Sequence, residues 1–572
     1  MIERTCRQSG EKFEITKADL KFYAKMGVIT AEQFEKLSSF PVDESVSISE
    51  EKIPQELLVG LPTLCPAERQ RRRLMFFNIH NLYKNNTLIS PHAPEYKLNV
   101  ISKNDFLNEK DSGLNYGRNF DFSRPFFEQF KELQIVSPRW DRMSLNAENS
   151  NWTTNSISLK NCYLVYSSTY LEDCLYCDRV DKSSDVVDCE DVKNSELCYG
   201  SLFLENCFEV LWSKKIKQST RSAFLQDCRN CSHCICCVGL KNKEYQIFNK
   251  PVSPEVFEET WNKLLRSSAF RADLWKKFKQ GCVLMPQKNL EIVSSDNCVG
   301  NNIFNCKNAW FSYEVKDCED IKFVQNALRS KDTMDCTNDD ESELSFENAI
   351  SFDLYNSKFN FTVAERCINL EYSETCLKCQ DCFGCVGLIN KQYCIFNRQY
   401  EQKEYFELRA KIIEHMKKTG EWGEFFPAEL SPFAYNETAA QVYFPLTQEE
   451  AEKRGYRWRD DQQSVQYTGP KYEISEDIAD VPDEVVNQVL ECERSGKFYR
   501  IQKRELDFYR KMNLPIPRLH PDERHKDRMA LRNPRKLWQR TCADCGCKIQ
   551  TTFAPDRPEK ILCEACYLKV VD

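Results

Sequence analysis

Between residues 158 and 228 the chain repeats a short pattern of polar and apolar positions. A polar residue, often Asn, Asp or Glu, precedes a cysteine, and a short β-prone run such as CYLVYSS, SSDVVDC or SELCYGS accompanies it. Helical spacing is rare in this stretch. Short strands that alternate with polar turn residues are typical of a β-solenoid, in which equivalent side chains stack from coil to coil. The pattern therefore predicts a mainly β chain with a β-solenoid-like core whose cysteines point inward.

The spacing of the cysteines is regular only in places. Two sets recur at every ninth position: Cys189, Cys198 and Cys207, and Cys367, Cys376, Cys385 and Cys394. Elsewhere the intervals are longer, at twelve, fifteen or eighteen positions, as from Cys162 to Cys174, from Cys174 to Cys189 and from Cys318 to Cys336. We therefore expect the coil length to vary or the turns to bulge.

The cysteine-rich core is duplicated. Residues 228–249 (CRNCSHCICCVGLKNKEYQIFN) and 376–397 (CLKCQDCFGCVGLINKQYCIFN) superpose at a constant offset of 148 residues. After each copy comes a run with helical spacing, one entered through Ser253 and Pro254 and the other starting near Glu401. We expect these two helices to cover the ends of the two halves and to shield their edges. A further helix is predicted after Thr447, which can form a capping box with Glu450.

The C-x2-C-x2-C-x2-C run in each copy leaves three interpretations open: a ladder of buried thiols, a zinc site or an iron–sulfur site. The bacterial ferredoxin run has three residues before its last cysteine and a proline after it, and both features are absent here. Asn-Cys and Asp-Cys pairs extend far beyond the two runs. That distribution favours the thiol ladder.

The two ends of the chain also resemble each other. The run from Cys6 (CRQSGEKFEI, then LKFYAKM) corresponds to the run from Cys492 (CERSGKFYRI, then LDFYRKM), and Cys65 corresponds to His520. Cys and His exchange readily as zinc ligands, so Cys6 with Cys65 and Cys492 with His520 are candidates for a second metal site. Two ligands do not close a tetrahedral site, so two unrelated buried side chains are the alternative in each module.

The strongest metal motif lies near the C-terminus, at 542–566 (CADCGCKIQTTFAPDRPEKILCEAC). Two C-x2-C pairs are separated by 17 residues, a length that suits a short hairpin, and each pair can offer two thiolates to one ion. The sequence predicts one Zn²⁺ in this module, with Cys547 outside the coordination shell. The predicted ligands are Cys542, Cys545, Cys563 and Cys566.

The N-terminal module has lost this motif. In the register of the two ends, Thr87 and Ser90 stand where Cys542 and Cys545 stand in the C-terminal module. Hydroxyl groups are poor zinc ligands, so the N-terminal module should hold no ion of this kind.

Composition restricts where the protein works. The chain has 30 cysteines among 572 residues, no apolar segment at its start and no run of membrane-spanning length. We expect a cytoplasmic protein without a membrane span, whose thiols stay reduced as metal ligands or small buried groups. The 79 Lys and Arg residues face 87 Asp and Glu residues, which argues against a nucleic-acid footprint over the whole chain.

These patterns divide the chain into seven predicted segments. In order they are a degenerate zinc-type module (1–86), a helical connector (87–157), the first cysteine-rich solenoid half (158–250), a helical cap and connector (251–297), the second solenoid half (298–400), a second helical connector (401–490) and a C-terminal zinc-ribbon-type module (491–572). The expected architecture is thus a duplicated β core with α-helical caps and small terminal modules.

Several runs resemble those of a known group of proteins. ALRNPRKLW, CADC, APDRPE and CEACYLK near the C-terminus, with CVGLINKQYCIFN and FFEQFKEL, are similar to runs in uncharacterised cysteine-rich zinc-binding proteins of candidate-phyla (Patescibacteria-type) bacteria. The resemblance covers nearly the whole chain and implies the fold and zinc, but no activity. Some members carry a CaiB/BaiF-type CoA-transferase label, and the repeats argue against that fold. This chain departs from the group where the N-terminal ribbon cysteines are missing.

The C-terminal module also has a basic character. From Cys492 to Asp572 there are 19 basic and 11 acidic residues. Four arginines are candidates for phosphate contact on one predicted helix that also carries Trp538: Arg524, Arg528, Arg532 and Arg535. A solvated helix face with intrahelical ion pairs is the alternative.

The sequence favours binding over catalysis. None of the six histidines lies in a nucleophile-elbow, HExxH or phosphate-loop context, and Asp381 replaces His233 in the second copy. Stacked repeats create long faces that suit a partner. We predict a non-enzymatic zinc-binding β-solenoid scaffold with a protein partner, and an RNA- or DNA-binding protein that uses the basic C-terminal module is the alternative.

Overall fold

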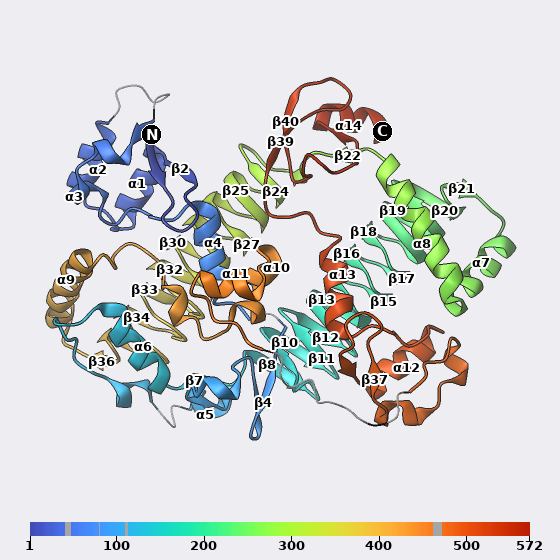
Figure 1. The fold of residues 1–572 in the computed structure, drawn as a ribbon, viewed down its shortest axis with the longest axis horizontal. Coiled ribbons are helices and arrows are strands. Elements are labelled where there is room, and N and C mark those ends of the chain that lie inside the picture. The colour runs from blue at the N-terminus through green and yellow to red at the C-terminus, as the bar shows by residue number, and fades with distance from the viewer. Residues whose placement is uncertain (41–46, 79, 109–111, 461–468, 470–471, 572) are drawn as a thin grey trace. The chain divides into compact units, whose positions relative to one another are not determined.

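The computed structural model describes residues 1–40, 47–78, 80–108, 112–460, 469 and 472–571. These residues are mainly β, as predicted, and form two compact units (Figure 1). Unit 1 contains Met1–Asp141 and Leu290–Arg459, and unit 2 contains Arg142–Asn289 and Asp460–Asp572. Each unit therefore joins two stretches that are far apart in the sequence.

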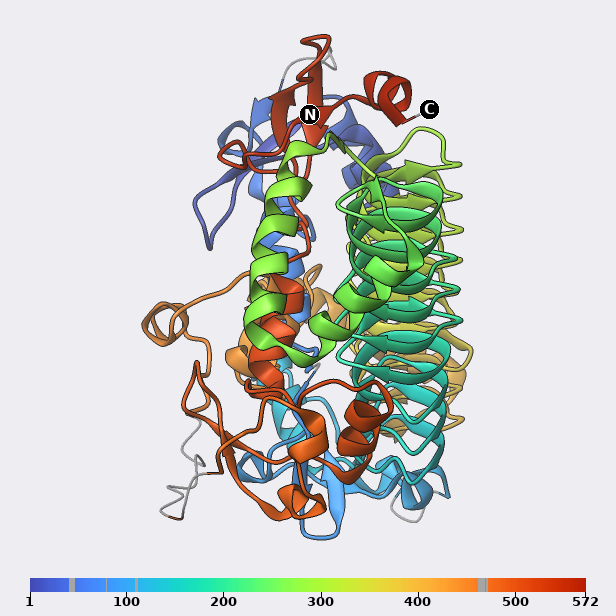
Figure 2. The ribbon, with the colours of Figure 1, turned by 90° about the vertical axis from the view of Figure 1, so that its right-hand side faces the viewer.

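The core of unit 2 is a 14-stranded sheet in which almost all strands are parallel. Figure 2 shows these strands, coloured cyan to green, stacked one above the next. The strands are β8 (Ser144–Glu148), β9 (Thr153–Thr154), β10 (Ser156–Lys160), β11 (Tyr163–Tyr166), β12 (Thr169–Glu172), β13 (Leu175–Val187), β14 (Glu190–Lys193), β15 (Glu196–Tyr199), β16 (Leu202–Glu205), β17 (Phe208–Leu211), β18 (Lys214–Lys217), β19 (Thr220–Val238), β20 (Lys241–Ile247) and β21 (Lys250–Pro251).

The register of this sheet is constant. Leu159 of β10 lies beside Leu171 of β12, and Val165 of β11 lies beside Cys177 of β13. In both pairs the partner stands twelve positions later in the chain, so each rung of the stack is twelve residues long. Rungs of different length are therefore not the cause of the varying intervals between cysteines in this sheet.

The backbone of the stack repeats at every third residue. Asn161, Leu164, Ser167 and Tyr170 all have φ between +48° and +58°, in the left-handed region. The residue after each of them is buried: Cys162, Val165, Ser168 and Leu171. Each rung therefore has four inward positions, spaced by three.

This period corrects the expectation that coil length varies for unit 2, where the partner in each parallel pair stands twelve positions later. The cysteine intervals of nine, twelve, fifteen and eighteen positions are all multiples of three, because a cysteine can occupy any of the four inward positions of a rung. The period also explains the polar residue before many cysteines. Asn161, Asp173 and Asp188 adopt positive φ, between +54° and +58°, and Asn and Asp tolerate this conformation better than other residues with a side chain.

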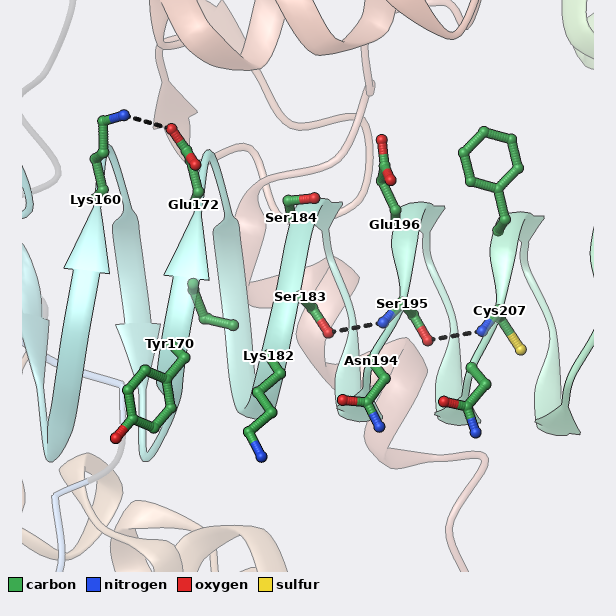
Figure 3. Close-up of a pocket in the computed structure, with 13 residues that line it drawn as sticks. Lys160, Tyr170, Glu172, Lys182, Ser183, Ser184, Asn194, Ser195, Glu196 and Cys207 are labelled. Carbon is green, nitrogen blue, oxygen red and sulfur yellow. Dashed lines mark hydrogen bonds and ion pairs between the residues drawn. The ribbon is translucent and has the colours of Figure 1, made fainter.

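Inward serines and cysteines also satisfy the backbone. The amide N–H of an inward residue donates to the side chain one rung earlier, as from Val180 to Ser168 Oγ (3.0 Å) and from Ser201 to Cys189 Sγ (3.4 Å). Figure 3 shows the same bond from Cys207 to Ser195 Oγ, at 3.0 Å. A buried N–H without an acceptor is costly. Small side chains that accept a hydrogen bond therefore suit these positions, which gives the abundant cysteines a structural role.

We expect Ser195→Ala to destabilise unit 2 by about 1–3 kcal/mol, because the N–H of Cys207 would lose its acceptor. Ser195→Cys should cost clearly less, because Cys189 shows that a thiol sulfur accepts the same bond. Denaturant unfolding and the amide hydrogen exchange of Cys207 measure the difference. Equal losses in the two variants would contradict the role given to the hydroxyl.

Unit 1 contains a second 14-stranded sheet of the same kind. Its register matches that of the first sheet in most pairs, but Ile292 pairs with Ile303, eleven positions later, and Leu354 pairs with Cys367, thirteen positions later. Consecutive positive φ values at Glu365 and Arg366 mark the extra residue. The expected variation in coil length therefore occurs in this unit. The strands are β23 (Ile292–Val293), β24 (Val299–Phe304), β25 (Lys307–Lys316), β26 (Glu319–Lys322), β27 (Gln325–Leu328), β28 (Lys331–Met334), β29 (Thr337–Asp340), β30 (Glu343–Phe346), β31 (Ala349–Phe352), β32 (Leu354–Lys358), β33 (Cys367–Glu371), β34 (Gln380–Phe383), β35 (Gln392–Ile395) and β36 (Arg398–Gln399).

Helices follow each sheet where the sequence predicts them. In unit 2, α7 (Pro254–Arg266) starts after the N-cap Ser253 and contacts β20, and α8 (Ser268–Leu284) contacts β19. In unit 1, α9 (Gln402–Thr419) contacts β35. The predicted capping box is also present, since Thr447 and Glu450 bond each other at the start of α11 (Gln448–Lys453).

Each unit also contains a terminal module. In unit 1 it comprises β1 (Ile2–Thr5), β2 (Lys12–Ile15), α1 (Lys17–Lys25), α2 (Ala31–Ser38), β3 (Ile48–Ser49), η1 (Glu50–Lys52), α3 (Gln55–Leu58) and α4 (Pro66–Leu74). In unit 2 it comprises η6 (Ile478–Asp480), η7 (Asp483–Asn487), β37 (Leu490–Glu491), β38 (Phe498–Tyr499), α12 (Lys503–Lys511) and α13 (Pro521–Met529). The module at the start of the chain therefore belongs with the second sheet, and the module near the end belongs with the first.

Short elements complete the two units. Unit 1 adds β4 (Tyr83–Asn85), β5 (Leu88–Ser90), η2 (Pro94–Tyr96), β6 (Val100–Ile101), α5 (Lys103–Leu107), η3 (Gly113–Tyr116), α6 (Phe126–Val136), β7 (Arg139–Trp140), η4 (Ala428–Leu430), η5 (Tyr435–Glu437) and α10 (Ala439–Tyr443). Unit 2 adds β22 (Gln287–Lys288), β39 (Trp538–Thr541), β40 (Lys548–Thr551), β41 (Ile561–Leu562) and α14 (Glu564–Val571). Among the described residues, no helix combines the length and the apolar character needed to cross a membrane.

Candidate metal centre

The C-terminal cysteines lie on a small hairpin and the helix that follows it. Strands β39 and β40 pair antiparallel, and the loop between them carries Cys542, Cys545 and Cys547. The loop turns tightly: Gly546 has φ +73°, and its N–H donates to the carbonyl oxygen of Cys542 at 3.0 Å. Because φ is positive there, a residue without a side chain suits this position. The turn directs the sulfurs of the loop toward β41 and the start of α14.

The neighbouring elements hold the second cysteine pair in place. Strand β41 pairs in parallel with β22, and Lys288 Nζ contacts Glu564 Oε1 at 2.6 Å. The N–H of Ala543 donates to the carbonyl oxygen of Ile561 at 2.9 Å, which ties the hairpin to β41. Cys563 and Cys566 follow directly, at the start of α14.

Four thiols of this module converge. The Sγ atoms of Cys542, Cys545, Cys547 and Cys563 all lie within 4.8 Å of one another, and those of Cys545 and Cys563 are 3.8 Å apart. Four thiolates at about 2.3 Å from one tetrahedral Zn²⁺ stand about 3.8 Å from each other. The donor set and its spacing therefore fit one metal ion at the C-terminus.

The backbone favours the thiolate form of Cys542. Burial opposes ionisation of this thiol, but the N–H groups of Cys563, Asp544 and Cys545 outweigh it and lower its pKa to about 6. The N–H of Cys563 donates to Cys542 Sγ at 3.3 Å. Thiolates are the metal-binding form of cysteine, so Cys542 is prepared for an ion.

The structure places a fifth thiol in the cluster, which the sequence interpretation leaves out. Cys547 is exposed, and its interaction with the Cys545 thiol raises its pKa to about 12. The predicted ligand Cys566 is not among the four sulfurs that converge, but its thiol interacts with those of Cys563, Cys545 and Cys542 and with the Asp544 carboxylate. The C-x2-C spacing alone leaves Cys547 out of the predicted ligands. The spacing does not show the turn at Gly546, which accompanies the return of the Cys547 sulfur to the cluster.

The candidate second sites each bring two predicted residues together. Burial and the Cys6 thiol raise the pKa of Cys65 to about 11, and Cys65 Sγ lies 3.7 Å from a carboxylate oxygen of Glu11. In the C-terminal module, the N–H of His520 donates to the Cys492 sulfur and helps to lower its pKa, against burial, and His520 Nδ1 accepts the N–H of Asp522 at 3.1 Å. Among the described residues, only the ribbon thiols form a group of three or more convergent ligand atoms.

The N-terminal counterpart of the ribbon keeps a hairpin without its thiols. Strands β4 and β5 pair antiparallel in this region. Thr87 lies in the turn, and Ser90 is buried in β5 with its Oγ accepting the N–H of His92 at 3.1 Å. The hydroxyl therefore has a structural partner.

The arginines predicted to contact nucleic acid are mostly buried. The helix α13 ends at Met529, so Arg532 and Arg535 lie beyond it, and Trp538 begins strand β39. Arg524 and Arg528 are 8% and 6% exposed. The predicted single basic helix is therefore wrong. Arg524 and Arg528 are on the helix but buried, and Arg532 and Arg535 lie beyond its end.

Buried carboxylates receive these arginines. Arg524 and Arg528 both bind Asp188, the latter with Nη1 to Oδ1 at 2.8 Å, and Arg524 Nη2 also binds Glu505 Oε1 at 3.2 Å. Arg532 binds Asp191. The ion pairs join α13 and α12 to the parallel stack of unit 2. Sequence reasoning missed Asp188, because it treats this residue only as the polar position before Cys189.

Unit 1 repeats this arrangement with equivalent residues. Arg69 and Arg73 of α4 bind Asp335, at 2.9 and 3.4 Å, and Arg73 also binds Glu347 at 3.1 Å. Asp335 precedes Cys336 in the second stack, as Asp188 precedes Cys189 in the first. The duplication therefore includes the contact between a terminal module and a stack.

The two C-x2-C-x2-C-x2-C runs, Cys228 to Cys237 and Cys376 to Cys385, are called the cassettes and lie within the parallel stacks. The cysteines of the two runs are buried members of the apolar clusters that fill the inward positions. Cys236, which is not part of the repeating spacing, faces Leu274 of α8 instead. Cys231 Sγ is placed to bond the carbonyl oxygens of Arg229 (3.4 Å) and Leu240 (3.5 Å), and Cys379 Sγ those of Leu377 (3.3 Å) and Leu388 (3.5 Å). These contacts favour the thiol ladder among the three interpretations of the cassettes.

Comparisons with known proteins do not assign a family. No family model matches the chain, and no curated protein matches it. Among solved structures, one described as a "putative acetyltransferase from Desulfovibrio desulfuricans G20" aligns with 47% of this chain and 81% of its own, at 10% identity and a TM-score of 0.11. A TM-score of this size carries no argument about the fold or the function of the chain.

Proposed function

We propose that this chain is a cytoplasmic, zinc-binding β-solenoid scaffold that holds a protein partner on the side of its first stack. The constant register of the unit 2 sheet supports the solenoid, and the four convergent thiols support the metal. The resemblance to cysteine-rich zinc-binding proteins supports the choice of zinc over other soft ions. Buried, free thiols in such number fit a reducing compartment.

A shallow groove on the stack of unit 2 carries the interaction proposal. Its volume is about 720 Å³, and 13 residues from neighbouring rungs line it (Figure 3). Tyr170 and Phe208 are 59% and 43% exposed in this groove. Exposed aromatic side chains are typical anchors of protein interfaces.

Charged side chains follow the same rungs. Lys160 Nζ contacts Glu172 Oε1 at 2.6 Å, one rung away, and Glu196 lines the groove further along. Figure 3 shows Lys160, Glu172 and Glu196 at one edge of the groove and Tyr170 and Lys182 at the other. Each edge thus joins one aromatic group to charged side chains: Phe208 pairs with Glu196 in the register, and Tyr170 lies at the edge of Lys182. Aromatic groups beside charges of both signs fit an extended protein segment better than a phosphate backbone, which requires positive charge.

A capture experiment tests this proposal. The full chain, with a tag, is used as bait in nuclease-treated extract of its native cell, beside the double variant Tyr170→Ala/Phe208→Ala. We expect a specific protein to bind the parent chain and to be reduced about tenfold or more with the variant, since aromatic anchors contribute about 2 kcal/mol or more at many interfaces.

The control changes outward side chains of unit 1. Tyr355 and Ile368 are 46% and 36% exposed, so Tyr355→Ala/Ile368→Ala is matched in chemistry and should leave capture unchanged. Circular dichroism must show the same fold for all three proteins. Equal capture by both variants would contradict the groove. A species captured from untreated extract but not from nuclease-treated extract would favour the nucleic-acid alternative.

A further inference from the structure

The C-terminal cluster offers five thiols to an ion that takes four. Cys542, Cys545 and Cys563 each have their Sγ within 4.8 Å of Cys547 Sγ, and each also interacts with the Cys566 thiol. These three cysteines are therefore ligands whichever thiol takes the fourth position. The fourth position then has two candidates, Cys547 and Cys566. Structural zinc sites are four-coordinate, so one of the two is left over.

The two candidates differ in their surroundings. Cys566 is 4% exposed and belongs to the apolar cluster with Ile549, Ile561 and Leu562. Cys547 is exposed and precedes the hairpin strand β40. A metal bound with Cys566 has a partly buried coordination shell, whereas a metal bound with Cys547 has its shell on the solvent side.

The loop keeps Cys547 at the cluster whichever thiol binds the ion. The carbonyl oxygen of Cys547 accepts the N–H of Cys542 at 2.8 Å, and the turn at Gly546 is closed by its own hydrogen bond to Cys542. The sulfur of Cys547 lies within 4.8 Å of three other sulfurs without any rearrangement of the loop. A thiol held this close to the ion favours ligand exchange, because it can form a transient fifth bond to the metal before another ligand is released.

We infer that the C-terminal module is an exchangeable zinc site, in which Cys547 displaces Cys566 and opens the bound ion to an external thiol ligand. This inference rests on the proposed zinc binding. In the step, a bond forms between the metal and the Cys547 sulfur, and the bond to the Cys566 sulfur breaks. The proton of the Cys547 thiol goes to solvent, and the released Cys566 thiolate takes one up, so no oxidant or reductant is involved.

The external ligand belongs to a definite chemical class. An ion held by Cys542, Cys545, Cys547 and Cys563 has two exposed residues among its ligands, Cys545 and Cys547, and is open to solvent on their side. A thiol-bearing acceptor can replace these ligands one at a time, because thiolates are interchangeable zinc ligands. The site would then donate zinc to, or accept it from, a thiol-rich protein or a dithiol chelator.

Isotope exchange on the full chain tests the inference. Protein loaded with Zn²⁺ is mixed with ⁶⁵Zn²⁺ in the presence of a dithiol chelator, and uptake of label is followed for the parent, Cys547→Ser, Cys566→Ser and the control Cys298→Ser. We expect all four to bind one ion, and Cys547→Ser to exchange roughly tenfold more slowly than the parent, a change of about 1.4 kcal/mol in the barrier. Cys566→Ser should exchange faster, and Cys298→Ser, which lies in unit 1, should exchange at the parental rate.

Cobalt(II) substitution provides a second measurement. Sulfur-to-cobalt charge-transfer bands should report four thiolates in each single ribbon variant and three in the double variant Cys547→Ser/Cys566→Ser. Equal exchange in the parent and Cys547→Ser, or loss of the ion from Cys566→Ser alone, would overturn the inference while leaving zinc binding intact. A parental chain that binds no zinc would overturn the proposed function itself.

Discussion

Replacing Asp188 by Ala should destabilise unit 2 by about 3–5 kcal/mol, the cost of leaving buried charges without a partner. Asp188 is 1% exposed and binds both Arg524 and Arg528. Both guanidinium groups are buried, so the variant would leave positive charge in the interior. Denaturant unfolding gives the free energy, and hydrogen exchange should show lost protection in α13 and in rungs near Cys189.

Two further variants make this expectation specific. Asp335→Ala in unit 1 should have a similar effect, because Arg69 and Arg73 converge on Asp335 in the same way. Asp185→Ala is the matched control: its partner Lys511 is 51% exposed, and exposed ion pairs contribute less than about 1 kcal/mol. A loss at Asp188 no larger than at Asp185 would show that the buried ion pairs do not hold the module on the stack.

Removing the metal should unfold the C-terminal ribbon while the parallel stacks remain folded. Structural zinc sites contribute about 10–16 kcal/mol of binding free energy in small peptides, and the ribbon has only a few buried apolar residues of its own. We expect Cys545→Ser/Cys563→Ser to lose one equivalent of zinc and to become sensitive to proteases between β40 and β41. Metal analysis and limited proteolysis, with and without a chelator, measure both effects.

The control for this experiment is Cys298→Ser, which removes a half-buried thiol outside the cluster. It should retain the metal and the protease resistance of the parent chain. Unchanged zinc content in Cys545→Ser/Cys563→Ser would show that the convergent thiols are not a metal site. A global loss of β structure on chelation would show instead that the stacks depend on the ion.

Local patterns in the sequence were sufficient for several parts of the fold. The mainly β character, the inward cysteines, the duplication at an offset of 148 residues and the helix starts at Ser253 and Thr447 are all visible in residue order. Each depends on neighbours within a few positions, or on the comparison of one stretch with another. The pairing of Cys492 with His520 and of Cys6 with Cys65 follows from the same internal comparison.

The geometry of the rungs was only partly accessible. The intervals between cysteines fit a period of three, but they do not show how many residues complete a rung. That number depends on which strands pair, as Leu159 does with Leu171, and pairing is a tertiary property. The need for side-chain acceptors such as Ser195 Oγ becomes clear only when the rung above is in place.

The sequence alone determined the repeated units and their cysteine chemistry, and the tertiary structure decided which side chains meet. Arg528 resembles a surface charge because acidic residues nearby in the sequence could pair with it on an exposed helix face, yet its carboxylate partner is Asp188, 340 residues away. Cys547 resembles a spare thiol because spacing ignores the left-handed turn at Gly546. Charge pairing and metal coordination depend on distance in space, which residue order specifies only where the chain turns back within a few residues.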